Sequence, residues 1–278
     1  MANPTADEAP VQEKRMSFFE HLEELRQRLK ASILAFVVAF VVFMTFSFQH
    51  GVMGLQIWLP VPWFNPAEVI ASQFLVAVKN FLIPPDVRSV ILTPWEAVVV
   101  QFKIAMFLAV IVISPLLTYE FWAFVAPALR PRERRLIVRV SVPVVLLFLG
   151  GVAMAFLVVL PFTIRFLYDI ARGLGVETLF QLQEFLDFIL LFSLAFGVAF
   201  ELPVIMYGLS ALGIVRPETW RRNWRYAAIA IFVFGAFITP DGSGITMMIV
   251  SLPMLGLYLG GYGASALRAR RSAAPKTS

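Results

Sequence analysis

Long apolar runs, separated by shorter polar and basic segments, divide this 278-residue chain. Apolar runs of about 20 residues predict helices that span a membrane. We expect six spans, at about residues 31–48, 95–117, 137–160, 183–212, 226–239 and 245–262. The pattern therefore predicts an all-α polytopic membrane protein, folded as a bundle of six transmembrane helices.

The segments outside the spans carry their own local signals. Ser17 with Glu20 fits a capping box, and the apolar stripe that follows it predicts an amphipathic helix leading into the first span. A helix over 67–82 is too short to cross a membrane and carries polar residues, so we expect it to lie at the outer surface. We expect a disordered tail over 1–15, a transmembrane domain over 16–263 and a basic cytoplasmic tail over 264–278.

Prolines and charges predict where helices end or are interrupted. Pro161 is expected to end the third span, with an outer loop over 162–181. Residues 121–135 are expected to form an inner loop. Glu201 and Pro203 interrupt the fourth span, and 240–244 has the composition of a tight turn.

Composition agrees with a lipid environment. The chain is 59% hydrophobic and only 15% charged, against about 25% charged residues in soluble domains. It has no cysteine, which excludes disulfides and thiolate chemistry, and its two histidines are too far apart in sequence to suggest a metal site. The net charge of +5 would suggest nucleic acid in a soluble protein, but here the basic residues flank apolar spans. We therefore expect no nucleic-acid partner.

The distribution of basic residues predicts orientation. Eighteen of the 23 lysines and arginines lie on one side of the predicted spans, and the other five are Lys79, Arg88, Lys103, Arg165 and Arg172. Basic residues concentrate in cytoplasmic loops. With an even number of spans, both termini are therefore expected on the cytoplasmic side.

Four segments carry a resemblance to a known family. They are HLEELRQRL at 21–29, FWAFVAPAL at 121–129 followed by RERR at 132–135, the glutamate-bearing GVAFELP at 197–203, and ITPD at 238–241. In this order, across nearly the whole chain, they resemble the TatC family of the twin-arginine protein translocase. The outer loop, at 49–93, departs from the resemblance.

The resemblance implies a function. TatC proteins are multi-pass proteins of the cell (inner) membrane that bind signal peptides with two consecutive arginines. They are not enzymes and have no cofactor. They export folded proteins with the single-span subunits TatA and TatB, driven by the proton-motive force. The implied partners of this chain are therefore TatA, TatB, signal peptides, the lipid bilayer and further copies of itself.

Recognition of two arginines calls for carboxylates, because a planar guanidinium matches a carboxylate bidentately and lysine does not. The resemblance implies this role for Glu24 and Glu133, and we expect both side chains to be exposed. From the residues alone, plainer interpretations are favoured. Glu24 would pair with Arg28 on a helix surface, worth about 0.2–0.5 kcal/mol, and Glu133 would be a solvated acid among arginines.

The other candidate residues have two interpretations each. Phe124 is placed in the signal-peptide surface by the resemblance and is otherwise an interfacial aromatic residue. Arg26 is either part of that site or a head-group anchor. Lys103 is expected to extend its ammonium group to the outer surface. Glu96 is expected to cap a helix, and Asp241 is either a turn former or a functional residue on the outer side.

Glu201 separates two classes of function. A charged acid inside a span costs about 2.5–3.5 kcal/mol on insertion scales and usually has a role. In a translocase, Glu201 is expected to dock a partner helix and to help weaken the bilayer beside the short fifth span. In the alternative, a proton- or ion-coupled transporter, it would be the ion site, and a third possibility is a membrane scaffold. A transporter needs several converging intramembrane charges, whereas a receptor needs paired acids on the inner face.

Overall fold

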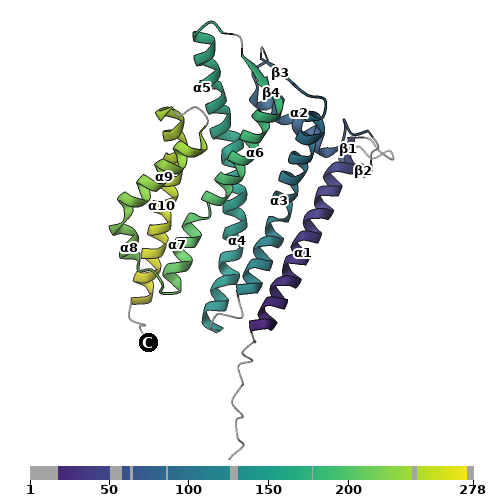
Figure 1. The fold of residues 1–278 in the computed structure, drawn as a ribbon. Coiled ribbons are helices and arrows are strands. Elements are labelled where there is room, and N and C mark those ends of the chain that lie inside the picture. The colour runs from purple at the N-terminus through teal and green to yellow at the C-terminus, as the bar shows by residue number, and fades with distance from the viewer. Residues whose placement is uncertain are drawn as a thin grey trace, which may run out of the picture.

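The computed structural model describes residues 18–50, 58–62, 65–85, 87–125, 131–176, 178–239 and 243–273. In this part of the chain, the long helices lie side by side in one bundle (Figure 1). Five helical stretches are long and apolar enough to cross a membrane, at 19–45, 96–125, 140–173, 182–211 and 244–270. These features are those of an all-α, multi-pass membrane protein.

The elements follow one another in a simple order. The helices are α1 (Phe18–Thr45), α2 (Ile70–Leu82), α3 (Glu96–Val125), α4 (Pro131–Met154), α5 (Leu160–Gly173), α6 (Leu182–Ala199), α7 (Leu202–Ala211), α8 (Pro217–Arg222), α9 (Trp224–Ile238) and α10 (Gly244–Ala273). A π-helical segment, Ala155–Val159, joins α4 to α5. The strands are β1 (Phe46–His50), β2 (Trp58–Pro62), β3 (Arg88–Val90) and β4 (Leu179–Gln181).

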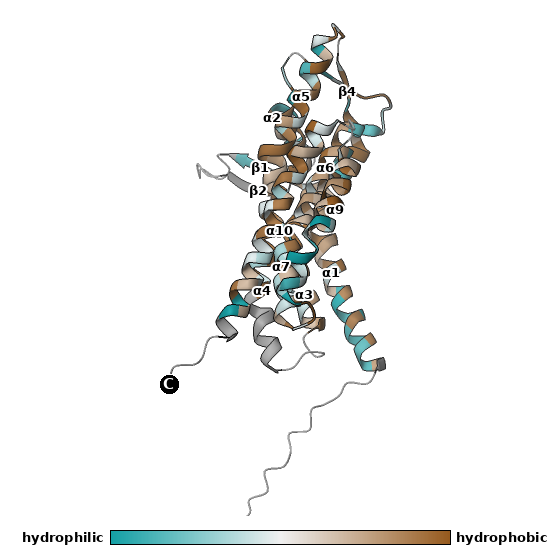
Figure 2. Cartoon of the chain, turned by 90° about the vertical axis from the view of Figure 1, so that its left-hand side faces the viewer, coloured by the Kyte–Doolittle hydropathy of each residue, from teal (hydrophilic) through white to brown (hydrophobic). Residues whose placement is uncertain are grey.

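Both ends of the described chain lie at one end of the bundle. In Figure 1, the start of α1 and the end of α10 point the same way, while the four strands and α2 lie at the opposite end. Figure 2 shows hydrophobic residues along the middle of the helices and hydrophilic residues in the first turns of α1. The fifth predicted span corresponds to α9, whose 15 residues reach only about 22 Å at 1.5 Å per residue.

The expected end of the third span at Pro161 is wrong. The helix continues to Gly173, because the π-helical turn before the proline adapts the backbone. Leu160 donates its N–H to the carbonyl of Ala155, five residues back. The wider turn accommodates a proline that has no N–H and whose ring would crowd a regular α-helical turn.

The expected inner loop over 121–135 is also largely helical. Helix α3 runs through the aromatic residues to Val125, and α4 begins at Pro131, a residue that is favoured in the first helical turn. The strands were not predicted from the sequence. β1 and β2 form an antiparallel hairpin, and β3 pairs in parallel with β4. By contrast, the predicted break at Glu201 is confirmed, since α6 ends at Ala199 and α7 begins at Leu202.

The core is built where helices approach each other closely. α1 packs on α3, α4 packs on α6, and α7 packs on α10. At Gly151 of α4, an added Cβ would lie 2.7 Å from the carbonyl oxygen of Phe196 in α6. Phe192 and Phe196 of α6 stack with centroids 4.8 Å apart and are almost fully buried. The two long helices are therefore held in one fixed register.

Glu96 fixes the outer end of this core. It is 1% exposed, and its carboxylate accepts hydrogen bonds from the backbone N–H groups of Leu92, at 2.9 Å, and Gln183, at 3.0 Å. Gln183 lies in the first turn of α6, where backbone N–H groups lack helical partners. Glu96 therefore caps a neighbouring helix as well as its own preceding turn, which extends the predicted capping role.

Candidate functional site

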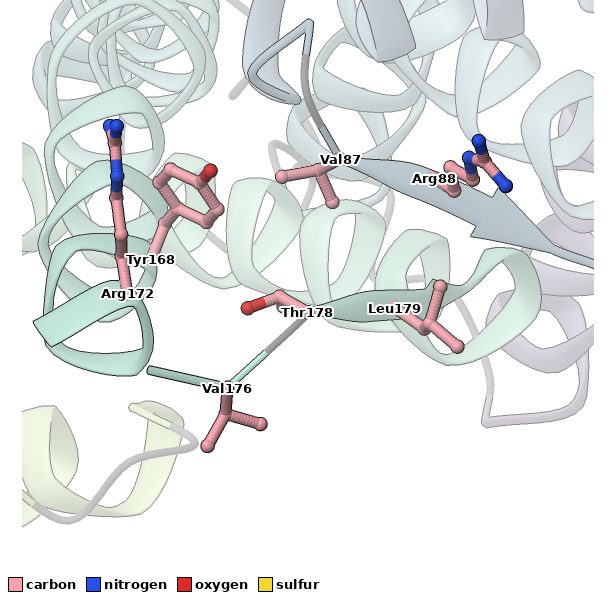
Figure 3. Close-up of a pocket in the computed structure, with 7 residues that line it drawn as sticks. All are labelled: Val87, Arg88, Tyr168, Arg172, Val176, Thr178 and Leu179. Atoms are coloured by element: carbon pink, nitrogen blue, oxygen red, sulfur yellow. The ribbon is translucent and has the colours of Figure 1, made fainter. Parts of the chain in front are cut away.

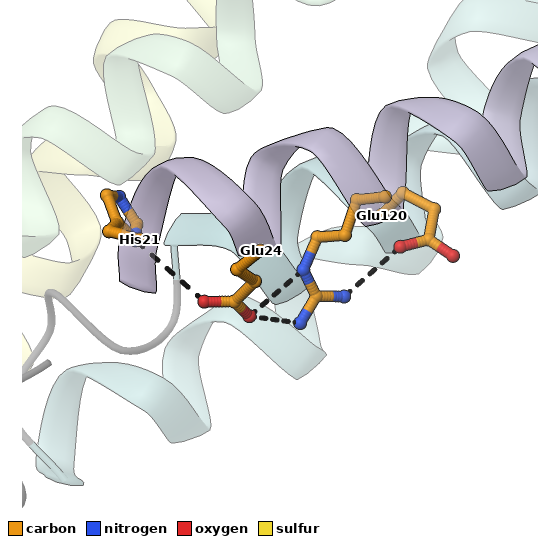
Figure 4. Close-up of polar contacts among 4 residues, drawn as sticks. His21, Glu24 and Glu120 are labelled. Carbon is orange, nitrogen blue, oxygen red and sulfur yellow. Dashed lines mark hydrogen bonds and ion pairs between the residues drawn. The ribbon is translucent and has the colours of Figure 1, made fainter. Parts of the chain in front are cut away.

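One face of α1, near its N-terminus, carries a cluster of polar side chains turned towards α3. His21, Glu24 and Arg28 are spaced by three and four residues, so they lie on the same side of the helix. Glu120 reaches the cluster from the last turns of α3. We call these four residues, shown in Figure 4, the α1–α3 cluster.

Arg28 joins the two carboxylates of the cluster. Its Nε, at 3.1 Å, and its Nη2 both donate to Glu24 Oε1, while Nη1 donates to Glu120 Oε2 at 3.1 Å (Figure 4). The pair of Glu24 and Arg28 is the i,i+4 contact expected from sequence. The bond to Glu120, 92 positions away, turns it into a link between two helices.

Glu24 is less accessible than expected. Its side chain is 17% exposed and that of Glu120 is 16% exposed, so the expectation of an exposed Glu24 is wrong. Packing of α1 on α3 covers the carboxylate. Its second oxygen, Oε2, is buried without a hydrogen-bond partner, and His21 Nδ1 lies 3.8 Å from it. The site therefore contains an acceptor that is ready for a donor.

An aromatic surface borders this unbonded oxygen. The imidazole of His21 stacks on the ring of Phe124, with centroids 4.3 Å apart and planes 13° apart. Phe124 comes from the last turn of α3, so the stack ties the end of α3 to the start of α1. The structure thus brings two of the predicted site residues, Glu24 and Phe124, to one place.

Of the other predicted residues of this site, the structure places only the side chain of Arg26, and it does not join Glu24. Arg26 lies on another face of α1, where its exposed side chain pairs with Glu23 at 3.4 Å. Glu133 lies in the first turn of α4, and its side chain is outside the described part of the chain. Its role therefore stays a prediction.

Two residues of the α1–α3 cluster were missed from the sequence. Glu120 lies directly before the aromatic segment 121–124, and an acid at the inner end of an apolar span was the available signal. His21 was noted only as the first residue of the family motif at 21–29, and the two histidines were judged too far apart in sequence to form a metal site. Among the described residues, no group of three His, Asp or Glu side chains is placed to hold a metal ion.

Glu201 occupies the break between α6 and α7. It stands at the N-cap position of α7, but its side chain makes no capping hydrogen bond. Its Oε1 is buried and has no hydrogen-bond partner. Within the described chain, no neighbouring helix donates a hydrogen bond to this oxygen. Asp241, the other residue predicted to meet a partner, lies outside the described residues.

A further charged pair crosses between helices nearer the outer end. Lys103 of α3 donates to both carboxylate oxygens of Asp187 in α6, at 2.6 and 2.7 Å. The carboxylate partner of Lys103 was not predicted from the sequence, which predicted only that its ammonium group extends towards the outer surface. Asp187 and Glu201 are 14 residues apart along this segment, or about 21 Å at helical rise, so they do not form one site.

A cavity opens at the outer end of the bundle, far from the α1–α3 cluster. It has a volume of about 580 Å³ and lies between the end of α5 and the β3–β4 ribbon (Figure 3). Its lining includes Arg88, Tyr168, Arg172 and Thr178. None of the residues predicted from sequence to bind a signal peptide lines it.

Comparison with known proteins gives one consistent result. Residues 20–253 match the family described as Sec-independent protein translocase protein (TatC). A protein of this name from Cenarchaeum symbiosum is 38% identical over 252 residues, covering 88% of this chain and 93% of the relative. A chloroplastic protein of the family from Arabidopsis thaliana is 32% identical, covering 93% of this chain and 68% of the relative.

The fold has a counterpart among solved structures. A crystal structure described as the twin arginine translocase receptor TatC superposes with a TM-score of 0.70 at 29% sequence identity. The match covers 90% of this chain and all of the solved chain.

Proposed function

Because this chain belongs to the TatC family and is a Sec-independent translocase protein and twin-arginine translocase receptor, we propose that the α1–α3 cluster binds the paired arginines of a signal peptide. Glu24 would receive one guanidinium and Glu133 would contribute the second carboxylate. The protein is a non-enzymatic transport component, so binding and not bond-making chemistry is the activity of this site.

The observation that carries the proposal is the unbonded, buried oxygen of Glu24. A half-buried carboxylate with an unsatisfied acceptor gains more from a charged donor than a solvated one does. The cluster also contains two carboxylates and one guanidinium, which leaves one negative charge if His21 is neutral. One further guanidinium balances that charge.

The neighbouring aromatic pair supports selectivity for arginine. A guanidinium is planar and weakly hydrated, so it stacks on aromatic faces while it donates in its own plane. Phe124 stacks on His21, whose Nδ1 lies 3.8 Å from Glu24 Oε2. A lysine ammonium group could satisfy the charge of Glu24 but would gain less from this surface.

The proposed function also includes an orientation of the chain in the membrane. The α1–α3 cluster lies at the end of the bundle where the described chain begins and ends (Figure 1), and the predicted cytoplasmic arginines gather in the segments of this end. We infer six spans with both termini in the cytoplasm, α9 being the short span. The site would then face the compartment in which signal peptides are made.

Transport itself would depend on partners. Within the proposal, single-span subunits of the TatA and TatB kind assemble with this chain, and the proton-motive force drives export of folded cargo. Glu201 is the proposed contact for a partner helix, since its buried oxygen lacks a donor within the chain. Asp241 is proposed as a second contact, on the outer side.

The transporter alternative has less support. It requires intramembrane charges that converge on one pathway. Lys103 and Asp187 neutralise each other, and Glu201 lies about 21 Å farther along α6 and α7. Among the described residues, these charged side chains do not converge on one point.

Peptide binding tests the proposal directly. Full-length protein in lipid nanodiscs would be titrated with fluorescent signal peptides that carry RR or KK, and anisotropy would report affinity. We expect RR to bind more tightly, and Glu24→Gln and Glu133→Gln each to weaken RR binding about tenfold or more, the size of a charge-assisted hydrogen bond. Glu218→Gln, an exposed acid on α8, is the matched control. Equal RR affinity in the parent and in both variants would refute the proposal.

A further inference from the structure

In the structure described, hydrogen bonds from Arg28 occupy one of the two carboxylate oxygens of Glu24 that a ligand could use. Oε1 of this residue accepts two hydrogen bonds, both from Arg28, and so uses both of its lone pairs. Only Oε2 is unbonded. A guanidinium fork that binds a carboxylate bidentately needs both oxygens. A signal-peptide arginine can therefore bind Glu24 in this way only if Arg28 releases Oε1.

Arg28 has a second acceptor within reach. Its Nη1 already donates to Glu120 Oε2 at 3.1 Å. If Arg28 leaves Glu24, it keeps this ion pair and can turn its other N–H groups towards the same carboxylate. Arg28 therefore never becomes an unpaired, half-buried charge, which would be costly.

Charge accounting favours the same exchange. In the state described, two carboxylates share one guanidinium. After the exchange, each carboxylate has a guanidinium of its own, with the ligand on Glu24 and Arg28 on Glu120. The attraction for a cationic ligand thus depends on Glu120 as well as on Glu24, even though Glu120 need not touch the ligand.

We propose that Arg28 is an internal competitor that occupies Glu24 in the free receptor, and that Glu120 is the alternative acceptor to which a signal-peptide arginine transfers it. This inference rests on the proposed function, in which Glu24 binds an arginine of the ligand. It adds two residues that set affinity and selectivity, one by competing and one by receiving the competitor. An incoming side chain must therefore displace the guanidinium of Arg28 in order to bind Glu24.

The exchange explains how lysine is rejected. An ammonium group offers point-like donors and does not match the two oxygens of a carboxylate in one plane. It therefore competes poorly against the two N–H groups that Arg28 donates to Glu24 Oε1. An open carboxylate without a competitor would discriminate less.

The test is a double-mutant cycle on full-length protein in nanodiscs, with RR and KK peptides as probes. We expect Arg28→Gln to tighten RR binding three- to tenfold and to narrow the gap between RR and KK, because the competitor is gone. Arg28→Lys should fall between parent and Arg28→Gln. Glu120→Gln should weaken RR binding about tenfold in the parent, the size of a lost charge-assisted hydrogen bond, and should have little effect in the Arg28→Gln background.

Two results of this double-mutant cycle would overturn the proposed exchange. Equal weakening by Glu120→Gln in both backgrounds would mean that Glu120 contacts the ligand directly, which overturns the exchange. Unchanged or weaker RR binding by Arg28→Gln, in protein whose unfolding midpoint matches the parent, would overturn the competition. If Arg28→Gln lowers that midpoint, Arg28→Lys carries the test, because it keeps the charge and must still relax the selectivity for RR.

The proposed function can fail separately. Weaker RR binding by Glu24→Gln together with no response to Arg28 or Glu120 substitutions would leave the receptor site standing and reject the exchange. No response to Glu24→Gln or to Glu133→Gln would reject the site itself. Glu218→Gln again serves as the control that should leave every affinity unchanged.

Discussion

The ammonium group of Lys103, in α3, lies between both carboxylate oxygens of Asp187, in α6, at 2.6 and 2.7 Å. The two residues are 84 positions apart, so the contact joins helices that are not consecutive in the chain. It also accounts for a lysine inside an apolar span, where an unpaired charge would be unfavourable.

We expect Lys103→Met and Asp187→Asn each to lower the stability of the protein. Since the side chains are 28% and 45% exposed, the loss should be about 0.5–1 kcal/mol and not the larger value of a fully buried pair. Thermal unfolding in detergent would measure it. The exchanged pair, Lys103→Asp with Asp187→Lys, should recover part of the loss; a double variant no better than the worse single one would contradict the ion pair.

Two adjacent glycines offer a matched test of the packing of α4 on α6. An alanine Cβ at Gly151 would lie 2.7 Å from the carbonyl oxygen of Phe196 and 2.9 Å from Cα of Gly197, and such backbone atoms do not move aside easily. Gly151→Ala should therefore cost about 1–3 kcal/mol of stability. Gly150→Ala has no atom within 4 Å and should be neutral or up to about 1 kcal/mol stabilising. Equal unfolding midpoints for the two variants would show that the helices are not in close contact here.

Glu201 should matter for transport and not for folding. Because its side chain caps no helix and Oε1 has no partner, Glu201→Ala removes no observed interaction of that oxygen, and stability should stay within about 0.5 kcal/mol of the parent or rise. Signal-peptide binding should also be kept. Export of a folded reporter and crosslinking to a single-span partner should fall, with Glu201→Gln milder because it still forms hydrogen bonds. Parental export and crosslinking by Glu201→Ala would reject the docking role.

The proposed topology can be mapped with single cysteines, since the chain has none of its own. Cysteines at Ala2, Pro131, Glu218 and Ser278 should resist an impermeant maleimide added to intact cells. Cysteines at Ser89 and Gly173 should react with it, because both lie at the opposite end of the bundle (Figure 1). Labelling of Pro131 or Glu218 from outside would invert or break the six-span arrangement.

Local signals in the sequence predicted much of the helical framework. Apolar runs identified the five long helices and the short α9, and Glu201 with Pro203 marked the break in the fourth span. The predicted ends of helices were wrong where the backbone departs from regular α-helical geometry. The helix continues through Pro161 because a π-helical turn precedes this residue. The pairing of β3 with β4 joins residues 91 positions apart, and no local sequence pattern predicts such a contact.

For the candidate site as well, the sequence predicted the local features and not the contacts between helices. The spacing of Glu24 and Arg28 predicted a pair on one face of a helix, and the family motifs drew attention to Glu24 and Phe124. Only the tertiary structure showed that Glu120 shares Arg28 with Glu24, that His21 stacks on Phe124, and that Lys103 meets Asp187. The physical reason is that helical periodicity determines which side chains share a face, whereas the packing of whole helices determines which faces meet.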